Sequence, residues 1–253
     1  MALSDTLAED ARVLIVRLSA IGDIVFASPI VAALRRAYPR AHIAWLVQPE
    51  CAALLDHHPG LDETIVCPMG HWRRLWRERH LGELARGIGT LRATLRERRF
   101  DLALDLQGLA KSGLLARLSG APRRIGLGSR EGSQWLMTRV IPRGGDPERI
   151  GSEYLYLAET LGLPTGRFEM AVHYSPADAE FGAETLARAG ISGGYAVLCP
   201  FTTRPQKHWG EERWATLAER VRAELGVTPV LLGGPGDQEA GRRIADDCDG
   251  ILV

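Results

Sequence analysis

Residues 13–23 read VLIVRLSAIGD, and this stretch decides the fold. Its first half is a short apolar run rich in valine and isoleucine, which predicts a strand buried on both faces of a parallel sheet. A polar turn ending in Gly22-Asp23 follows, and Ser28-Pro29 then supplies a capping residue and a proline, a common opening of a helix. A strand, a turn and a helix in that order are the first half of a βαβ unit.

The same alternation runs outward along the chain. Apolar runs predict strands over 13–18, 42–47, 63–67, 101–106, 195–199 and 228–232. Helical periodicity predicts helices over 30–38, 81–98, 109–118, 147–161, 176–189, 212–225 and 237–247. Strands that alternate with helices of this length predict an α/β fold built on parallel sheets.

The 253 residues suit two domains. A helix ends near Leu163-Pro164 and Pro176 opens another, so we expect a first domain over 1–170 and a second over 176–253. The second domain supplies strand, helix, strand and helix, and then stops in a further apolar run. Because a complete doubly wound domain repeats such units, we expect that it is cut short by roughly 60–90 residues.

Composition excludes several classes of protein. Hydrophobic residues make up 45% and charged residues 25%, as in a globular domain with a core. The 31 basic and 31 acidic residues cancel, which gives no argument for a nucleic-acid partner. The first residues are acidic rather than basic, unlike a signal peptide, and no apolar run approaches the roughly 20 residues of a membrane span. The scattered cysteines are typical of reduced thiols, so we expect a cytoplasmic protein, and their spacing predicts no metal site.

Two carboxylates follow predicted strands, at the sheet edge where α/β proteins bind ligands. Asp23 follows the first strand, and Asp237 closes the turn Gly233–Asp237 after the last one. Asp23 suits a general base, and Asp237 suits an acid that binds a ribose. Each suits a helix N-cap equally well on the local sequence.

Only two of the 31 basic residues are lysines, and both follow predicted strands. Lys111 stands where the helix over 109–118 begins, and its alternative interpretation is a solvated side chain. Lys207 shares the loop 199–209 with the hydroxyls of Thr202 and Thr203. Hydroxyls, N–H groups and an ammonium before a helix suit a diphosphate, although a plain polar surface loop is the alternative.

The segment 71–99 holds nine arginines against three acidic residues. A charged helix face is the usual explanation of such a run. Here four arginines cluster around Trp72 and Trp76, which also suits an anionic sugar or phosphate partner. They are Arg73, Arg74, Arg77 and Arg79.

Three of these segments together resemble glycosyltransferase family nine, the heptosyltransferases. They are VLIVRLSAIGD at 13–23, DLQGLAKS at 105–112, and TTR…KHW at 202–209, and the similarity extends over the whole chain. The resemblance implies a GT-B fold, with two Rossmann-like domains of parallel strands, the second incomplete in this chain. It also implies an inverting enzyme of lipopolysaccharide core synthesis that needs no cofactor and moves L-glycero-D-manno-heptose from ADP-heptose to Kdo-lipid A.

The resemblance assigns roles to the residues named above. Asp23 matches the general base, and Asp237 matches the acid near the ribose. The diphosphate contacts match Thr202, Thr203 and Lys207, whereas the positions that face the anionic acceptor match Lys111, Arg73, Arg74 and Arg77. The first domain would then serve the acceptor, at the cytoplasmic face of the inner membrane, and the second would serve the nucleotide sugar.

Two alternatives stay open at this point. The family's later donor-binding loop, Asp-Thr/Ser-Gly-x-x-His, would fall beyond Val253, so the chain is also compatible with a non-catalytic remnant that binds the lipopolysaccharide core. The second alternative is another GT-B enzyme that acts on nucleotide sugars, such as an epimerase.

Overall fold

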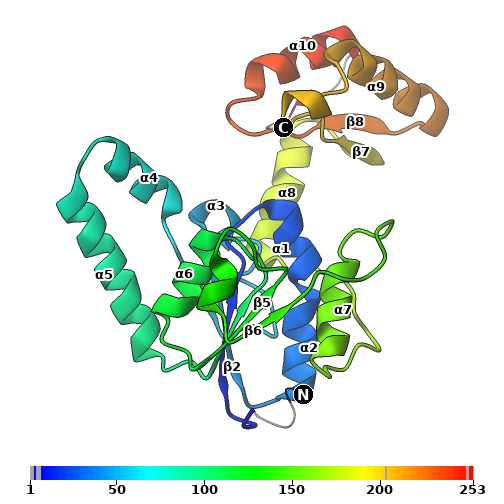
Figure 1. Cartoon of the computed structure of the whole chain (residues 1–253). Helices are drawn as coiled ribbons and strands as arrows, with labels where there is room; N and C mark the ends of the chain where they lie inside the picture. The colour runs from blue at the N-terminus through cyan, green and yellow to red at the C-terminus, as the bar shows by residue number, and fades with distance from the viewer. Residues whose placement is uncertain (1–2, 4–6, 203, 249–250, 253) are drawn as a thin grey trace. The chain divides into compact units, whose positions relative to one another are not determined.

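The computed structural model describes residue 3 and residues 7–202, 204–248 and 251–252. The chain forms two compact units, Met1–Tyr174 and Ser175–Val253 (Figure 1).

Unit 1 is built on a six-stranded parallel sheet of order β3-β2-β1-β4-β5-β6. Its strands are β1 (Arg12–Val16), β2 (His42–Val47), β3 (Glu63–Val66), β4 (Leu102–Asp105), β5 (Arg123–Leu127) and β6 (Arg139–Ile141). The order reverses between β1 and β4, whose carboxyl ends therefore carry the two neighbouring turns where ligands bind in such sheets.

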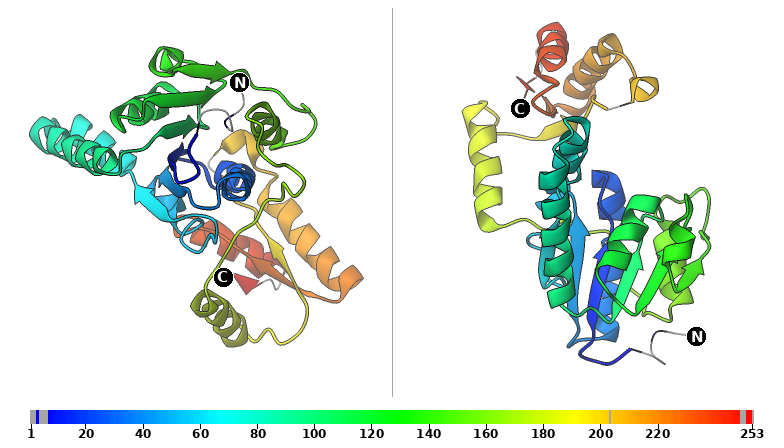
Figure 2. Two further views of the ribbon diagram at one scale, coloured as in Figure 1. Left: turned by 90° about the horizontal axis from the view of Figure 1, so that it is seen from below. Right: turned by 60° about the vertical axis from the view of Figure 1, so that its left-hand side comes forward.

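Helices cover both faces of this sheet (Figure 2). They are α1 (Ile21–Ala27), α2 (Pro29–Ala37), α3 (Pro49–Ala52), α4 (Met69–Arg77), α5 (Leu81–Glu97), α6 (Ala110–Leu118) and α7 (Ser152–Thr160), with a 3₁₀ turn η2 (Ser133–Leu136). Val13 and Ile15 pack against α1, α2 and α7, whereas Leu14 and Val16 pack against α4, α5 and α6. Alternate residues of β1 are thus buried on opposite faces, which explains its continuous apolar sequence.

Unit 2 holds a three-stranded parallel sheet of order β7-β8-β9. Its elements are α8 (Pro176–Arg188), β7 (Tyr195–Leu198), the 3₁₀ turn η3 (Pro205–Lys207), α9 (Glu211–Leu225), β8 (Thr228–Leu231), α10 (Gln238–Cys248) and β9 (Ile251–Leu252). A small core forms where Leu198 and Leu231 of the sheet meet Ala218 of α9 and Ile244 of α10.

The predicted α/β class is confirmed, and several local predictions are wrong. Residues 21–27 form helix α1, which runs directly into α2, so Ser28-Pro29 is not the first helical start. The helix expected from residue 147 begins at Ser152, because Gly151 adopts a positive φ angle that a right-handed helix excludes. Strands β5 and β6 were not expected, since arginines and glycines break their apolar runs.

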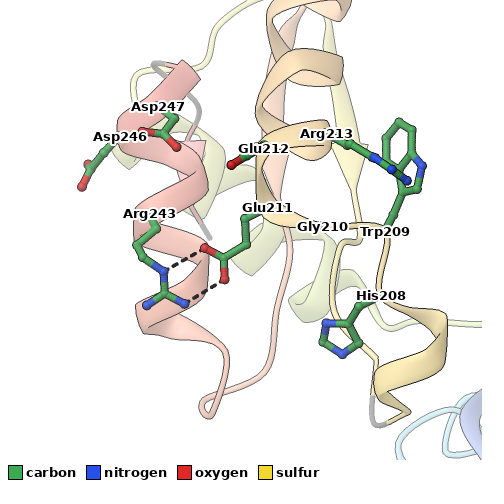
Figure 3. A pocket seen from close by; sticks show the side chains of 9 residues that line it. All are labelled: His208, Trp209, Gly210, Glu211, Glu212, Arg213, Arg243, Asp246 and Asp247. Atoms are coloured by element: carbon green, nitrogen blue, oxygen red, sulfur yellow. Dashed lines mark hydrogen bonds and ion pairs between the residues drawn. The ribbon is translucent and has the colours of Figure 1, made fainter.

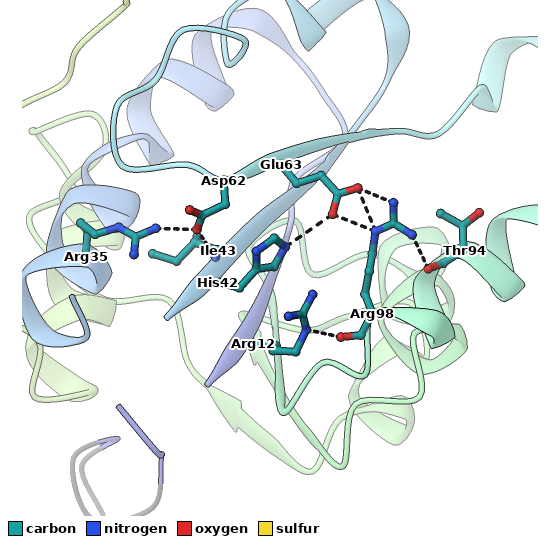
Figure 4. A network of polar contacts seen from close by, with 8 residues as sticks. All are labelled: Arg12, Arg35, His42, Ile43, Asp62, Glu63, Thr94 and Arg98. Atoms are coloured by element: carbon teal, nitrogen blue, oxygen red, sulfur yellow. Dashed lines mark hydrogen bonds and ion pairs between the residues drawn. The ribbon is translucent and has the colours of Figure 1, made fainter. Parts of the chain in front are cut away.

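Polar contacts of Arg98 join α5 to the amino ends of β1 and β3 (Figure 4). Arg98, at the end of α5, donates from Nε to both carboxylate oxygens of Glu63 on β3, each at 2.8 Å. Arg98 also donates to the carbonyl of Thr94 at 2.7 Å, and its own carbonyl accepts from Arg12 of β1. This network fastens α5 to the sheet at the edge opposite the turns that follow β1 and β4.

Within the residues that the structure describes, no helix combines the length and apolar character needed to cross a bilayer.

Candidate functional site

In unit 1, side chains join the turns that follow β1 and β4. Val16 and Asp105 are register partners at the ends of these strands. Beyond them, Arg17 donates from Nη1 to the carbonyl of Leu106 at 3.1 Å, and the N–H of Leu18 donates to Gln107 Oε1 at 3.2 Å. The two turns singled out in the sequence therefore form one surface.

Asp23 lies in the first turn of α1, with its side chain 46% exposed. Its Oδ2 lies 2.6 Å from Arg17 Nη2 and accepts a hydrogen bond from the N–H of Ala20 at 3.2 Å. Among the described residues, Oδ1 takes part in no hydrogen bond or ion pair. The carboxylate thus caps α1 with one oxygen and leaves the other to accept a proton, so the two interpretations of Asp23 are compatible.

Arg17 is a site residue that sequence reasoning did not single out. Its side chain is only 8% exposed, and the indole N–H of Trp45 donates to its carbonyl at 3.0 Å. The sequence does contain a sign of its role, because Arg17 is the one charged residue in the apolar run 13–18. A buried charge at such a position needs a charged or hydrogen-bonding partner.

Asp105 is the second carboxylate at this edge, and it is fully buried. Its Oδ1 accepts hydrogen bonds from the N–H groups of Gln107 and Gly108, each at 3.0 Å. Burial raises the pKa of the Asp105 carboxyl, while these donors and the Arg17 charge act in the opposite direction. Asp105 therefore holds the turn after β4 in place. Helix α6 follows this turn, and Lys111 lies in its first helical turn.

Lys111 is half-buried, and no hydrogen bond or ion pair of its ammonium occurs among the described residues. An uncompensated cation at a helix N-terminus is slightly unfavourable, and a nearby anion would relieve this. The position therefore suits an anionic ligand.

In unit 2, the loops that follow β7 and β8 lie together. A Cβ atom on Gly233 would stand 2.7 Å from the ring of Phe201, so this glycine permits the contact between the loops. Thr202 and Lys207 belong to the first loop, and His208 Nε2 donates to the carbonyl of Thr202 at 2.8 Å.

Two further predicted donor residues belong to these loops. Thr203 lies outside the described residues. Asp237 Oδ2 accepts a hydrogen bond from the N–H of Gly234 at 2.9 Å, just before α10. It therefore closes the glycine turn, as the capping interpretation expects, and its other oxygen has no partner among the described residues.

A pocket of about 930 Å³ lies beside these loops, between α9 and α10 (Figure 3). Arg243 donates to both oxygens of Glu211 at 2.8 Å, and this contact lowers the pKa of Glu211. Glu212, Asp246 and Asp247 add further carboxylates to the lining. Four carboxylates against Arg213 and Arg243 give the lining a net negative charge, which disfavours phosphate. Neither Thr202 nor Lys207 lines the pocket.

The arginines expected to meet an acceptor lie on α4. Trp72 is buried beneath this helix, where Gly87 of α5 permits the close approach: a Cβ atom there would lie 2.9 Å from the Trp72 indole nitrogen. Arg73, Arg74 and Arg77 are consequently exposed. Helices α4 and α5 follow the edge strand β3 in the chain and extend away from the turns after β1 and β4 (Figures 1 and 2). The structure thus places the arginines on an element separate from the turns that hold Asp23 and Lys111.

Comparison with known sequences supports the resemblance given by the three segments. The model of glycosyltransferase family 9 (heptosyltransferase) matches residues 88–253. Lipopolysaccharide heptosyltransferase 1 of Pseudomonas aeruginosa is 30% identical over 247 residues, which cover 96% of this chain and 66% of that protein. The protein of the same name from Escherichia coli K12 is 26% identical over 256 residues, covering 93% and 72%.

Solved structures agree on the fold. A family 9 glycosyltransferase of Veillonella parvula matches with a TM-score of 0.82 at 20% identity, covering 97% of this chain and 70% of that one. The E. coli heptosyltransferase WaaC, solved with ADP, matches with a TM-score of 0.73 at 26% identity, covering 96% and 74%. The expected GT-B fold class is thereby confirmed. The chain spans about two thirds of the length of these relatives (66% to 74%), and it belongs to glycosyltransferase family 9, the heptosyltransferase family.

Proposed function

We propose that this protein transfers L-glycero-D-manno-heptose from ADP-heptose to Kdo-lipid A during synthesis of the lipopolysaccharide inner core, with inversion at the sugar carbon. Family membership and relatives named lipopolysaccharide heptosyltransferase 1 support this activity. The observation that carries it is the Asp23 carboxylate, fixed through one oxygen at the end of β1 with the other oxygen left open.

Asp23 is the general base of the proposed reaction. An acceptor hydroxyl is a weak nucleophile, and a positioned carboxylate that takes its proton accelerates attack by about 10²–10⁴-fold. Oδ1 takes the proton as the hydroxyl oxygen forms its bond to the anomeric carbon of the heptose. The bond between that carbon and the diphosphate oxygen breaks, and ADP leaves with the electron pair.

The donor side of the proposal rests on unit 2. Lys207 and the hydroxyls of Thr202 and Thr203 would bind the diphosphate, where negative charge grows as ADP leaves. Fixed cations and N–H donors stabilise such charge in the transition state. Asp237 would accept a hydrogen bond from a ribose hydroxyl through the oxygen that Gly234 leaves open.

The acceptor side of the proposal rests on unit 1. Lys111 would pair with an acidic group of Kdo-lipid A near Asp23. The exposed Arg73, Arg74 and Arg77 of α4 would bind the anionic lipid head group, and this would bring the protein to the cytoplasmic face of the inner membrane.

Mass spectrometry of a reaction that contains the protein, ADP-heptose and Kdo-lipid A tests the proposal. We expect a product heavier than the acceptor by one heptose residue, together with release of ADP. Binding of Kdo-lipid A without product would instead identify a non-catalytic binder. Transfer from a different nucleotide sugar alone would identify another specificity.

A further inference from the structure

Beneath the exposed Asp23, unit 1 buries polar groups that the proposed reaction does not use. Arg17 is 6% exposed, Tyr154 of α7 is 1% exposed, and Asp105 has no exposed surface. Arg17 Nε and Tyr154 Oη are buried polar atoms without a hydrogen-bond partner among the described residues. A buried polar atom without a hydrogen-bond partner lowers the stability of the fold, so several buried polar residues close to Asp23 need an explanation.

The Arg17 guanidinium links these buried groups to Asp23. Its two Nη atoms contact different partners, Asp23 Oδ2 at 2.6 Å and the carbonyl of Leu106 at 3.1 Å. Its charge also acts on Asp105 and on Tyr154, where it opposes the burial that raises the pKa of Tyr154 to about 12. Asp105 of β4 and Tyr154 of α7 thus lie within electrostatic range of one guanidinium, whose Nη2 contacts the half-exposed side chain of Asp23.

We propose that Arg17 is a positioning residue for the reaction of Asp23: it is held by the Leu106 carbonyl, among Asp105 and Tyr154, and it fixes Asp23 Oδ2 so that Oδ1 faces the acceptor hydroxyl. This inference rests on the proposed function. Arg17 touches no reacting atom and acts only through the carboxylate.

The planar fork of arginine explains why this residue type is needed. Two separate Nη atoms reach two oxygens on different elements at once, whereas a lysine has a single nitrogen on a flexible stem. Arg17→Lys keeps the charge and loses this two-point anchorage, and Arg17→Met loses both. Since misplacement by about 1 Å can cost 10²-fold in rate, both variants should lower kcat, with methionine the worse.

The split between kcat and KM separates positioning from general damage. Arg17 contacts Asp23 Oδ2 and the Leu106 carbonyl through its Nη atoms, and both lie in unit 1. A residue that acts only by orienting the base should therefore lower kcat and leave the KM for ADP-heptose unchanged.

The experiment measures kcat and KM for ADP-heptose and Kdo-lipid A at one fixed pH near neutrality, with thermal melts of every protein. Arg40→Met is the matched control, because Arg40 is an exposed arginine whose side chain pairs only with Glu9 among the described residues. We expect kcat of Arg17→Met to fall about 10–100-fold, with the KM for ADP-heptose within about twofold of the wild type. Arg40→Met should match the wild type.

A double-mutant cycle completes the test. If Arg17 acts through Asp23, adding Arg17→Met to Asp23→Asn should lower kcat no further than Asp23→Asn alone. Should the methionine variant fail to fold, Arg17→Lys takes its place in the same cycle, with a smaller expected loss. The inference is overturned if the folded Arg17 variants keep wild-type kcat, if the losses multiply, or if the KM for ADP-heptose rises as much as kcat falls. Absence of transfer by the wild type would overturn the proposed function, and this inference with it.

Discussion

Asp23, in the first turn of α1, and Asp105, at the end of β4, have opposite environments. The Asp23 side chain is 46% exposed and pairs with Arg17, whereas Asp105 is fully buried and binds the N–H groups of its own turn. The surroundings of two carboxylates can divide their roles within one site. Under the proposed function, they suit Asp23 to meet the substrate and Asp105 to hold the turn.

The two lysines provide a prediction at this scale. Lys207→Ala should weaken ADP binding, since it removes the cation assigned to the diphosphate. Lys111→Ala should leave ADP binding unchanged and raise the KM for Kdo-lipid A. Calorimetric titration with ADP and steady-state kinetics measure the two effects. Equal losses of ADP affinity would show that the assignment of these lysines to opposite substrates is wrong.

Among the elements, the turn after β4 depends on one glycine. Gly108 has a φ of 69°, and a Cβ atom there would lie 2.5 Å from the carbonyl oxygen of Leu127. Gly108→Ala should therefore lower the free energy of unfolding by about 1–3 kcal/mol. Gly89→Ala is the control, since nothing lies within 4 Å of its Cβ position in α5, and it should not destabilise the protein. Equal melting temperatures of the two variants would contradict this account of the turn.

The contact between Glu63 and Arg98 gives a second prediction for the elements. Hydrogen bonds from Arg98 lower the pKa of Glu63 in the folded protein, so the contact stabilises the protein above the unfolded pKa of about 4.3 and fades below it. Glu63→Gln should lower the free energy of unfolding by about 1 kcal/mol at pH 7. The difference from the wild type should shrink as pH falls through the folded-state pKa of Glu63. Urea denaturation between pH 3 and 7 measures it, and a difference independent of pH would exclude the ion pair as its cause.

The elements also show what could be predicted from sequence. Strands such as β1 were predictable because both of their faces are buried and the sequence is continuously apolar. Strand β5 was not predicted, because it begins with Arg123 and Arg124. Helix α1 was not predicted, because it is short and runs directly into α2. Local sequence could identify Asp23, but its pairing with Arg17, and the contact of Arg17 with Leu106 across 89 positions, depend on the folded sheet.

At the scale of the whole molecule, the two units differ in the size of their cores. Unit 1 buries apolar residues on both faces of a six-stranded sheet, whereas the core of unit 2 is confined to a few residues around Leu198 and Leu231, and α8 has no buried residue. A region with few buried apolar contacts has a lower free energy of local unfolding. We expect slower amide hydrogen exchange in β1, β2 and β4 than in β7 and β8. Uniform protection of both sheets would contradict this expectation.

The most direct test of the central claim compares turnover of the wild type and Asp23→Asn at matched binding of ADP-heptose. If this family 9 protein transfers heptose with Asp23 as the base, kcat should fall by about 10²-fold or more while the donor affinity stays within about twofold, because only the proton acceptor is lost. Turnover of Asp23→Asn close to that of the wild type would contradict the account and leave Asp23 as a helix cap.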